Sequence, residues 1–438
     1  MTPRPGAERS TDSYLPAHGN GGYRVVHYDL ELDYRIVSNR LGGRAVVTAV
    51  ADEPLSRFTL DMGRLRVSDV RVGGRPARFS QRPGKLRITP AQPVAGHFVA
   101  EIRYAGKPVP IPGRWGDIGW DELTDGVLVA SQPIGAPSWF PCDDRPAAKA
   151  AFRVTITAPT PYTVVVTGDL VGRRRGAGTT TWMYERAEPT SPYLMSVQIG
   201  RYELIDLVPG GAVRQRAAVP PRLRRRFAHD FGRHGEIMTA LEGFFGPYPF
   251  REYVVVVADD DLDDPVEAQG MAVFGKNHVD GRRTHERLVA HELAHQWFGN
   301  SLTVADWRHI WLNEGFATYA EWLWSGVRGG LSAATQAAQW HARLAIRPSA
   351  IRVADPGVDN MFDPMVYKRG ALTLHALRVE IGDELFFRMV RGWVADHQHA
   401  TVTGEQFRAY AQSYTPKPLG ALFTAWLDRP ALPPLPRR

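Results

Sequence analysis

Apolar and polar residues alternate along the first half of the chain, after a short polar start. In one stretch Tyr28, Leu30 and Leu32 alternate with polar neighbours, which is the period-two pattern of a strand with one buried face. Similar short runs follow, separated by glycine, proline, asparagine and aspartate. We therefore predict an all-β domain over residues 23–207, built as a sandwich or saddle of antiparallel sheets.

The spacing of apolar residues changes to the helical period from about Arg222. Residues 224–246 predict one amphipathic helix closed by Gly246, and residues 251–260 predict a short buried strand. Most of the chain beyond them repeats the helical pattern, so we assign residues 208–430 to a second, mainly helical domain. The predicted fold class is α+β in at least two domains, as expected for a chain of 438 residues.

The segments outside these domains are rich in turn formers. Residues 1–22 have no continuous apolar core, so they predict a disordered leader and not a secretory signal. Residues 209–222 predict a linker, and the proline-rich residues 431–438 predict an extended tail. No run approaches the ~18 apolar residues of a membrane span. We therefore expect a cytoplasmic protein with no membrane contact.

Charge and cysteine content narrow the range of partners. The chain has a formal net charge of +7. Its arginine clusters, at residues 173–175 and 222–226, lack the interleaved aromatic residues of a nucleic-acid-binding motif. We interpret them as solvated surface and expect no nucleic acid partner. The single cysteine, Cys142, excludes an internal disulfide. The sequence makes no prediction about the oligomeric state.

One helical stretch carries residues suited to bind a metal. His291 and His295 are one helical turn apart, so both imidazoles can reach one ion. Glu314, in the later stretch WLNEGF, offers a carboxylate as the third ligand. Two nitrogens and one oxygen suit Zn²⁺ and leave its fourth position for water, as in catalytic zinc sites. Glu292 lies beside the ligands and is the candidate proton acceptor.

The same stretch has a purely structural interpretation. Leu288, Val289 and Leu293 make the helix apolar around most of its circumference, so we expect it to be buried. Its histidines would then be core residues that donate to backbone carbonyls. We favour the zinc site because the HExxH pattern is followed at a suitable spacing by Asn-Glu-Gly.

Several segments of the chain resemble one family. HELAHQWFGN followed by WLNEGFATY resembles the M1 family of zinc aminopeptidases, the gluzincins that include aminopeptidase N and leukotriene A4 hydrolase. Three further stretches resemble segments of that family, namely PSWFPCDDRPAAKAAF at 137–152, FGPYPF at 245–250 and FDPMVYKRGALTLHAL at 362–377. The resemblance covers residues 23–430 and implies a thermolysin-like fold for the second domain.

The resemblance also implies roles for individual residues. The three candidate ligands match the family's zinc ligands, and Glu292 matches its general base. Tyr367 matches the tyrosine that donates a hydrogen bond to the oxyanion. Gln132 matches a glutamine at the amino end of the substrate. Glu267 matches the glutamate of the family's GAMEN loop, which anchors the substrate amine.

The chain departs from the family pattern in three places. Asp264, Pro265 and Val266 replace the first residues of the GAMEN loop. His309 stands where members commonly have an acidic residue, which predicts different support for the zinc site. Many members continue into further β and helical domains, and nothing after Pro430 matches them. We therefore expect a short form in which the cavity is more open or is closed by a partner.

Together these motifs predict a zinc metallo-aminopeptidase with one Zn²⁺ per chain. Its partners would be peptide substrates with a free N-terminus, whose α-ammonium group pairs with Glu267. Glu292 would take a proton from the metal-activated water and return it to the leaving amine. Two alternatives remain open. One is a zinc endopeptidase or other hydrolase without a free-amine requirement, and the other is a non-catalytic scaffold that binds peptides.

Overall fold

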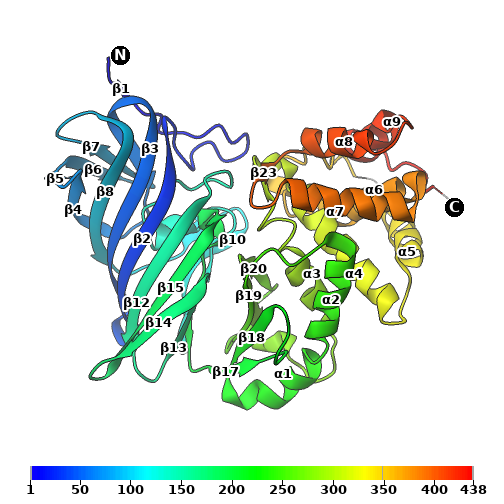
Figure 1. The fold of residues 1–438 in the computed structure, drawn as a ribbon, viewed down its shortest axis with the longest axis horizontal. Helices are drawn as coiled ribbons and strands as arrows, with labels where there is room; N and C mark the ends of the chain where they lie inside the picture. Colours follow the sequence, from blue (N-terminus) through cyan, green and yellow to red (C-terminus); the bar gives the residue numbers. More distant parts are fainter. Residues whose placement is uncertain (1, 348, 437–438) are drawn as a thin grey trace. The chain divides into compact units, whose positions relative to one another are not determined.

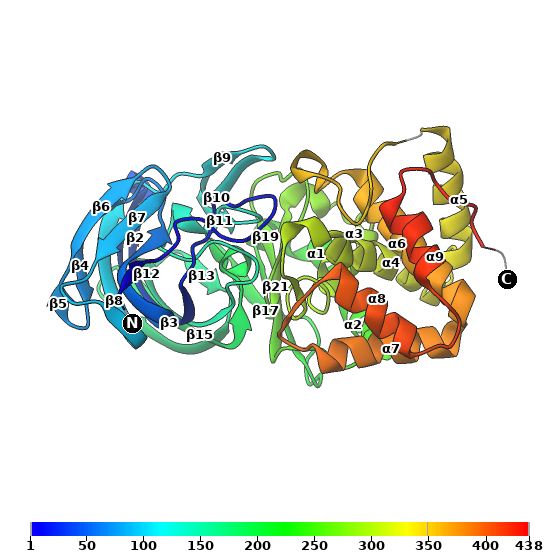
Figure 2. The same cartoon turned by 90° about the horizontal axis from the view of Figure 1, so that it is seen from above.

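The computed structural model describes residues 2–347 and 349–436, and its contacts divide the chain into two compact units. Figures 1 and 2 show their elements. The first unit comprises Met1–Asp206, Arg216–Arg224 and Glu252–Asn277, and the second comprises Leu207–Gln215, Arg225–Arg251 and His278–Arg438. Strands dominate the first unit and helices dominate the second, so the predicted α+β class is confirmed.

In the described residues of the first unit, the largest sheet has eleven strands. They are β1 (Arg4–Pro5), β2 (Tyr23–Arg35), β3 (Arg40–Asp61), β4 (Arg66–Val72), β5 (Arg75–Pro76), β6 (Arg78–Arg82), β7 (Lys85–Thr89), β8 (Val94–Gly106), β12 (Ala150–Pro159), β14 (Asp169–Arg175) and β15 (Thr179–Thr190). Most pairs are antiparallel as predicted, but β12 runs parallel to β2 and β1 runs parallel to β3. The alternation read from the sequence holds, because Tyr28, Leu30 and Leu32 are all buried.

Two smaller sheets complete the first unit. One contains β9 (Ile111–Gly113), β10 (Gly116–Leu123), β11 (Gly126–Ala130), β13 (Thr163–Val166) and β16 (Val197–Gly200). Its side chains share a hydrophobic core with the large sheet, which curves around it in Figure 2, so the predicted sandwich or saddle is confirmed. The other contains β17 (Glu203–Asp206), β18 (Arg214–Val219), β19 (Glu252–Ala258), β20 (Val266–Ala268) and β21 (Met271–Gly275).

This third sheet differs from the predicted organisation in two ways. β18 lies within residues 209–222, so the expected linker forms a strand. β18 to β21 also cluster mostly with the first unit, whereas the sequence predicted a single boundary at residue 207. The physical reason is a shared hydrophobic cluster, in which Leu128 and Val165 pack with Val254 and Val256.

The start of the chain is another correction, because the described part of the predicted leader, residues 2–22, is not disordered. The Gly6 N–H donates to the Arg57 carbonyl at 2.8 Å beside the β1–β3 pairing. Asn20 is buried and donates to the carboxylates of Asp61 at 2.9 Å and Asp143 at 2.7 Å. Buried carboxylates need donors, and this segment supplies them. Residue 1 lies outside the described residues.

The second unit is mainly helical. Its elements are α1 (Arg224–Asp230), α2 (His234–Phe245), α3 (Glu286–Ala294), β22 (Thr303–Val304), α4 (Trp311–Val327), α5 (Ala333–Ile346), α6 (Pro364–Ile381), α7 (Asp383–Asp396), β23 (Thr401–Val402), α8 (Gly404–Ser413) and α9 (Gly420–Phe423). No helix within the described ranges has the length and apolarity of a membrane span. Residues 431–436 form neither helix nor strand, while 437 and 438 of the predicted tail lie outside the described residues.

Candidate functional site

The predicted ligand histidines lie on the short helix α3 of the second unit. His291 is in its last turn and His295 is the residue at its C-terminal end. Both are buried, as are Val289 and Leu293 between and beside them. The apolar side chains therefore fix the helix in the core, and the two imidazoles are left on one face. Their ring centroids are 4.8 Å apart.

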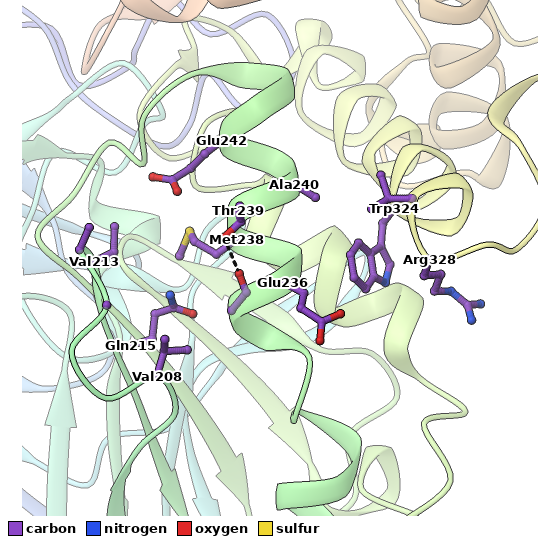
Figure 3. Close-up of a pocket in the computed structure, with 14 residues that line it drawn as sticks. Val208, Val213, Gln215, Glu236, Met238, Thr239, Ala240, Glu242, Trp324 and Arg328 are labelled. Atoms are coloured by element: carbon purple, nitrogen blue, oxygen red, sulfur yellow. Dashed lines mark hydrogen bonds between the residues drawn. The ribbon is translucent and has the colours of Figure 1, made fainter.

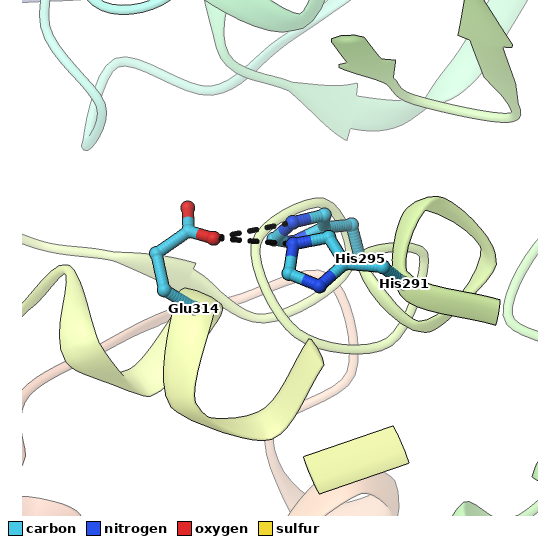
Figure 4. A group of neighbouring side chains, drawn as sticks. All are labelled: His291, His295 and Glu314. Carbon is cyan, nitrogen blue, oxygen red and sulfur yellow. Dashed lines mark ion pairs between the residues drawn. The ribbon is translucent and has the colours of Figure 1, made fainter. Parts of the chain in front are cut away.

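A different acceptor holds the Nδ1 atom of each histidine. His291 Nδ1 is 2.8 Å from Oε1 of Glu321, and His295 Nδ1 is 3.0 Å from the carbonyl oxygen of Phe298. If each Nδ1 carries the proton, each Nε2 has a lone pair for a metal. Both Nε2 atoms point to the same oxygen, Oε2 of Glu314, at 3.5 Å each (Figure 4).

Two glycines bring the third ligand and the predicted tyrosine into one site. Glu314 is in the first turn of α4 and Tyr367 is in the first turn of α6. These helices cross at Gly315 and Gly370, where a Cβ added to Gly315 would lie only 3.0 Å from the backbone of Gly370. A larger side chain at either position would push the helices apart. The glycine that follows Glu314 in the sequence therefore has a packing role.

The charges at the site are strongly coupled. Burial alone would lower the pKa of His291, but hydrogen bonds to Glu314 and Glu321 outweigh it and raise the pKa to about 9. Burial alone would raise the pKa of Glu314, but the nearby histidines lower it to about 2. Without a metal, these carboxylates therefore hold a proton on His291. The same negative potential attracts a cation.

The residues present fit a divalent metal. One ligand atom from each of His291, His295 and Glu314 lies within 4.8 Å of the other two, and all three residues are buried. Two imidazole nitrogens and one carboxylate oxygen form a donor set that suits zinc. The structure therefore brings the three predicted ligands together.

The remaining predicted residues of this unit lie next to the ligands. Glu292 follows His291 on α3 and is buried. The ring of Tyr367 lies nearly parallel to that of His291, with centroids 6.1 Å apart and planes inclined by 13°. A phenol and a carboxylate therefore flank the ligand set.

The other two predicted residues lie together in the first unit. Gln132 follows β11, and its Nε2 donates to Oε1 of Glu267 at 2.8 Å. Glu267 is buried in the short edge strand β20, which pairs antiparallel with β21. Asp264 and Pro265 lead into β20, and Val266 is its first residue, directly before Glu267.

The sequence reasoning missed Glu321, the carboxylate that accepts from His291. It follows Glu314 by seven residues, which is two helical turns, so both acids lie on one face of α4. That spacing was the available signal. His309, where we expected the support to differ, has its Nε2 3.6 Å from Oε2 of Glu405. Support for His291 comes from Glu321.

A cavity of about 640 Å³ lies beside α2 in the same unit (Figure 3). The loop before β18, one face of α2 and the end of α4 line it, including Met238, Trp324 and Arg328. No predicted site residue is among those that line it. The cavity and the predicted metal site therefore share no residue.

Comparison with known proteins relates both parts of the chain to one family. The family model for the Peptidase M1 N-terminal domain matches residues 25–194. The family model for the Peptidase family M1 domain matches residues 231–426. The two matches together cover most of the chain.

Two solved structures are similar along almost the whole chain. A mutant M1 zinc metallopeptidase from Deinococcus radiodurans, bound to a Tyr-Ser-Ala substrate, is 30% identical with a TM-score of 0.88, over 97% of this chain and 99% of that one. Native yeast LTA4 hydrolase is 22% identical with a TM-score of 0.81, over 95% of this chain and 69% of that one. The second similarity concerns the fold alone.

Curated relatives are longer than this chain. Aminopeptidase M1-D from Oryza sativa subsp. japonica is 26% identical over 333 residues, which is 71% of this chain and 38% of that protein. Leucyl aminopeptidase from Saccharolobus solfataricus is 24% identical over 439 residues, which is 94% of this chain and 54% of that protein. The matches thus span about half or less of these relatives.

Proposed function

This chain belongs to the M1 peptidase family, and from that premise we propose that it is a zinc aminopeptidase that removes the N-terminal residue from peptides. The observation that carries the proposal is the ligand set, in which both histidine Nε2 atoms point to one oxygen of Glu314. A decayed scaffold would have no need to keep three buried donors in this arrangement.

His291, His295 and Glu314 would hold the ion. A divalent ion bound there supplies Lewis acid chemistry, because it lowers the pKa of a water molecule and polarises a carbonyl. Glu321 and the Phe298 carbonyl orient the two rings through their Nδ1 atoms.

Glu292 and Tyr367 would carry the proton and the charge during hydrolysis. Glu292 takes a proton from the attacking water and returns it to the amine that leaves. Tyr367 donates a hydrogen bond to the carbonyl oxygen as negative charge develops on it. Their positions beside the ligand set support these roles.

Gln132 and Glu267 would bind the amino group of the substrate. The carboxylate of Glu267 pairs with the α-ammonium group, and the hydrogen bond from Gln132 orients that carboxylate. A charge pair of this kind restricts cleavage to the first peptide bond. The role rests on the family resemblance and on the 2.8 Å contact between the two side chains.

The test is hydrolysis of chromogenic aminoacyl amides, each run beside its N-acetylated form with zinc present. An aminopeptidase releases the chromophore from the free amines only. Equal rates on both forms would favour the endopeptidase alternative and remove the role of Glu267. No release from either form by zinc-loaded protein would favour the non-catalytic scaffold.

The variant Glu292→Gln distinguishes these results from a contaminating peptidase. It keeps the size of the side chain but cannot accept the proton, so kcat should fall by roughly 10²–10⁴-fold while zinc binding persists. An unchanged rate would show that the measured activity does not come from this site.

A further inference from the structure

Side chains from two helices, α3 and α6, converge on one buried carboxylate, that of Glu321 on α4. His291 on α3 contacts its Oε1 at 2.8 Å, and Arg287, one turn earlier on α3, contacts its Oε2 at 3.3 Å. Lys368 on α6 approaches Oε1 with its Nζ at 3.8 Å. The carboxylate that supports a metal ligand is therefore also paired with two cations.

The two cations differ in burial. The side chain of Arg287 is 60% exposed, whereas that of Lys368 is 14% exposed. Water screens the first charge and screens the second much less. Lys368 also lies over the ring of Trp340 on α5, with Nζ 5.1 Å from the ring centroid. An anion and an aromatic face both favour an ammonium group, so Lys368 is the more effective charge at this carboxylate.

Lys368 adds a largely buried positive charge beside several buried carboxylates. Glu292, Glu314 and Glu321 are three buried carboxylates in and around the ligand set. A divalent ion neutralises two of these charges, and the Lys368 ammonium group neutralises the third. Without the lysine, one buried negative charge would remain after metal binding, and it would attract the metal more strongly.

We propose that Lys368 is a positioning residue that acts through Glu321 and limits how tightly the site binds its metal. This inference rests on the metal site of the proposed function. It gives a role to Lys368, for which the sequence motifs suggested none. The ammonium group repels a cation bound at the ligands and acts without contacting the substrate.

Metal affinity tests the inference directly. Lys368→Met and Lys368→Gln remove the charge, and Lys368→Arg preserves it. The zinc affinity of each metal-free protein is measured by competition with a calibrated chromophoric chelator. Because a repelling charge is removed, both neutral variants should bind zinc on the order of tenfold more tightly than the wild type. Lys368→Arg should stay within about threefold. Unchanged or weaker binding in the neutral variants overturns the inference.

The contrast between neutral and charged replacements is the second readout. A general loss of packing would change all three variants alike, whereas an effect of charge spares Lys368→Arg.

Two controls separate this inference from its premises. Arg287→Met removes the exposed cation from the same carboxylate and should change zinc affinity by less than about threefold. Circular dichroism of the metal-free variants shows whether each is folded, and two neutral replacements guard against one that is not. Wild-type protein that binds no zinc would overturn the proposed function, whereas equal affinities across the Lys368 variants would overturn this inference alone.

Discussion

The two ligand histidines are held by acceptors of different charge. His295 has the neutral carbonyl of Phe298 at its Nδ1, whereas His291 has the carboxylate of Glu321 there and that of Glu314 near its Nε2. Two anions therefore stabilise the doubly protonated ring of His291 in the metal-free protein. The metal has to replace one of those protons.

This competition predicts how metal affinity depends on pH. Because the pKa of His291 is raised to about 9, the ring is charged in the metal-free protein at neutral pH, and binding a metal releases one proton. Zinc affinity should therefore fall about tenfold between pH 8 and pH 7. Chelator competition at the two pH values measures it. Equal affinities would contradict the prediction, and Glu321→Gln should reduce the dependence because it removes one anion.

The position of a single side chain can be predicted from the sequence where helix geometry alone determines it. The four-residue spacing of His291 and His295 leaves little freedom, so the approach of their two rings could be predicted. Glu321 has an equally regular position after Glu314, but only the packing of α3 against α4 brings it to His291. Lys368 reaches the same carboxylate from α6, and no local pattern relates the two.

Among the helices, α6 is joined to the last described segment by one buried side chain. The guanidinium group of Arg369 donates to the carbonyls of Trp426, Pro430, Ala425, Arg429 and Ala431, at 2.5 to 2.9 Å. The residue is fully buried, and burial lowers its pKa to about 10. It thereby satisfies the carbonyls at the end of a π-helical turn, Thr424–Asp428.

Replacing Arg369 should therefore destabilise the second unit. Arg369→Met removes one buried and four partly buried hydrogen bonds, so the free energy of unfolding should fall by about 3 kcal/mol. Arg388, whose side chain is 61% exposed, gives the control Arg388→Met, which should stay within about 0.5 kcal/mol. Denaturant unfolding of the three proteins measures both changes. Equal stabilities would mean that the five hydrogen bonds contribute nothing net.

The break between α1 and α2 shows what periodicity misses at the scale of elements. Residues 224–246 predicted one helix, but the chain turns after Asp230. The carboxylate of Asp230 accepts from the backbone N–H groups of Gly281 at 2.8 Å and Arg283 at 2.9 Å. These partners lie about fifty residues further along the chain. The local apolar pattern contains no sign of such a distant contact, so it continues across the break between the two helices.

For the whole molecule, composition gave the number of units but not their boundary. Glycine and proline near residue 209 predicted a linker, and the strands after it were assigned to the second domain. Val254 and Val256 instead bury their side chains with Leu128 and Val165 of the first unit. The free energy gained by burying these apolar side chains outweighs the turn-forming preference of the local sequence. The first unit includes segments from both sides of residue 207, so no single boundary in the sequence separates the two units.

The first residues of the chain are tied to the first unit by a charged pair that depends on pH. His18 Nδ1 lies 3.0 Å from Oδ2 of the buried Asp144. Burial alone would lower the pKa of His18, but the hydrogen bond and charge of Asp144 outweigh it and raise the pKa. Asp61 acts in the same direction and Lys85 opposes it. Burial raises the pKa of Asp144 to about 6, so this carboxyl group also binds protons more tightly when folded.

The stability that His18 contributes should therefore be larger in acid. A histidine with a raised pKa stabilises the fold fully below about pH 6.5, its unfolded value, and loses that contribution as the pH rises through its folded value. At pH 6.5, where Asp144 is still largely ionised, His18→Gln should lower the free energy of unfolding by about 1 kcal/mol, and the difference should shrink as the pH rises toward 8. The exposed His97 gives the control His97→Gln, which should show no such trend. A difference that grows toward pH 8 would mean that neutral His18 is the stabilising form.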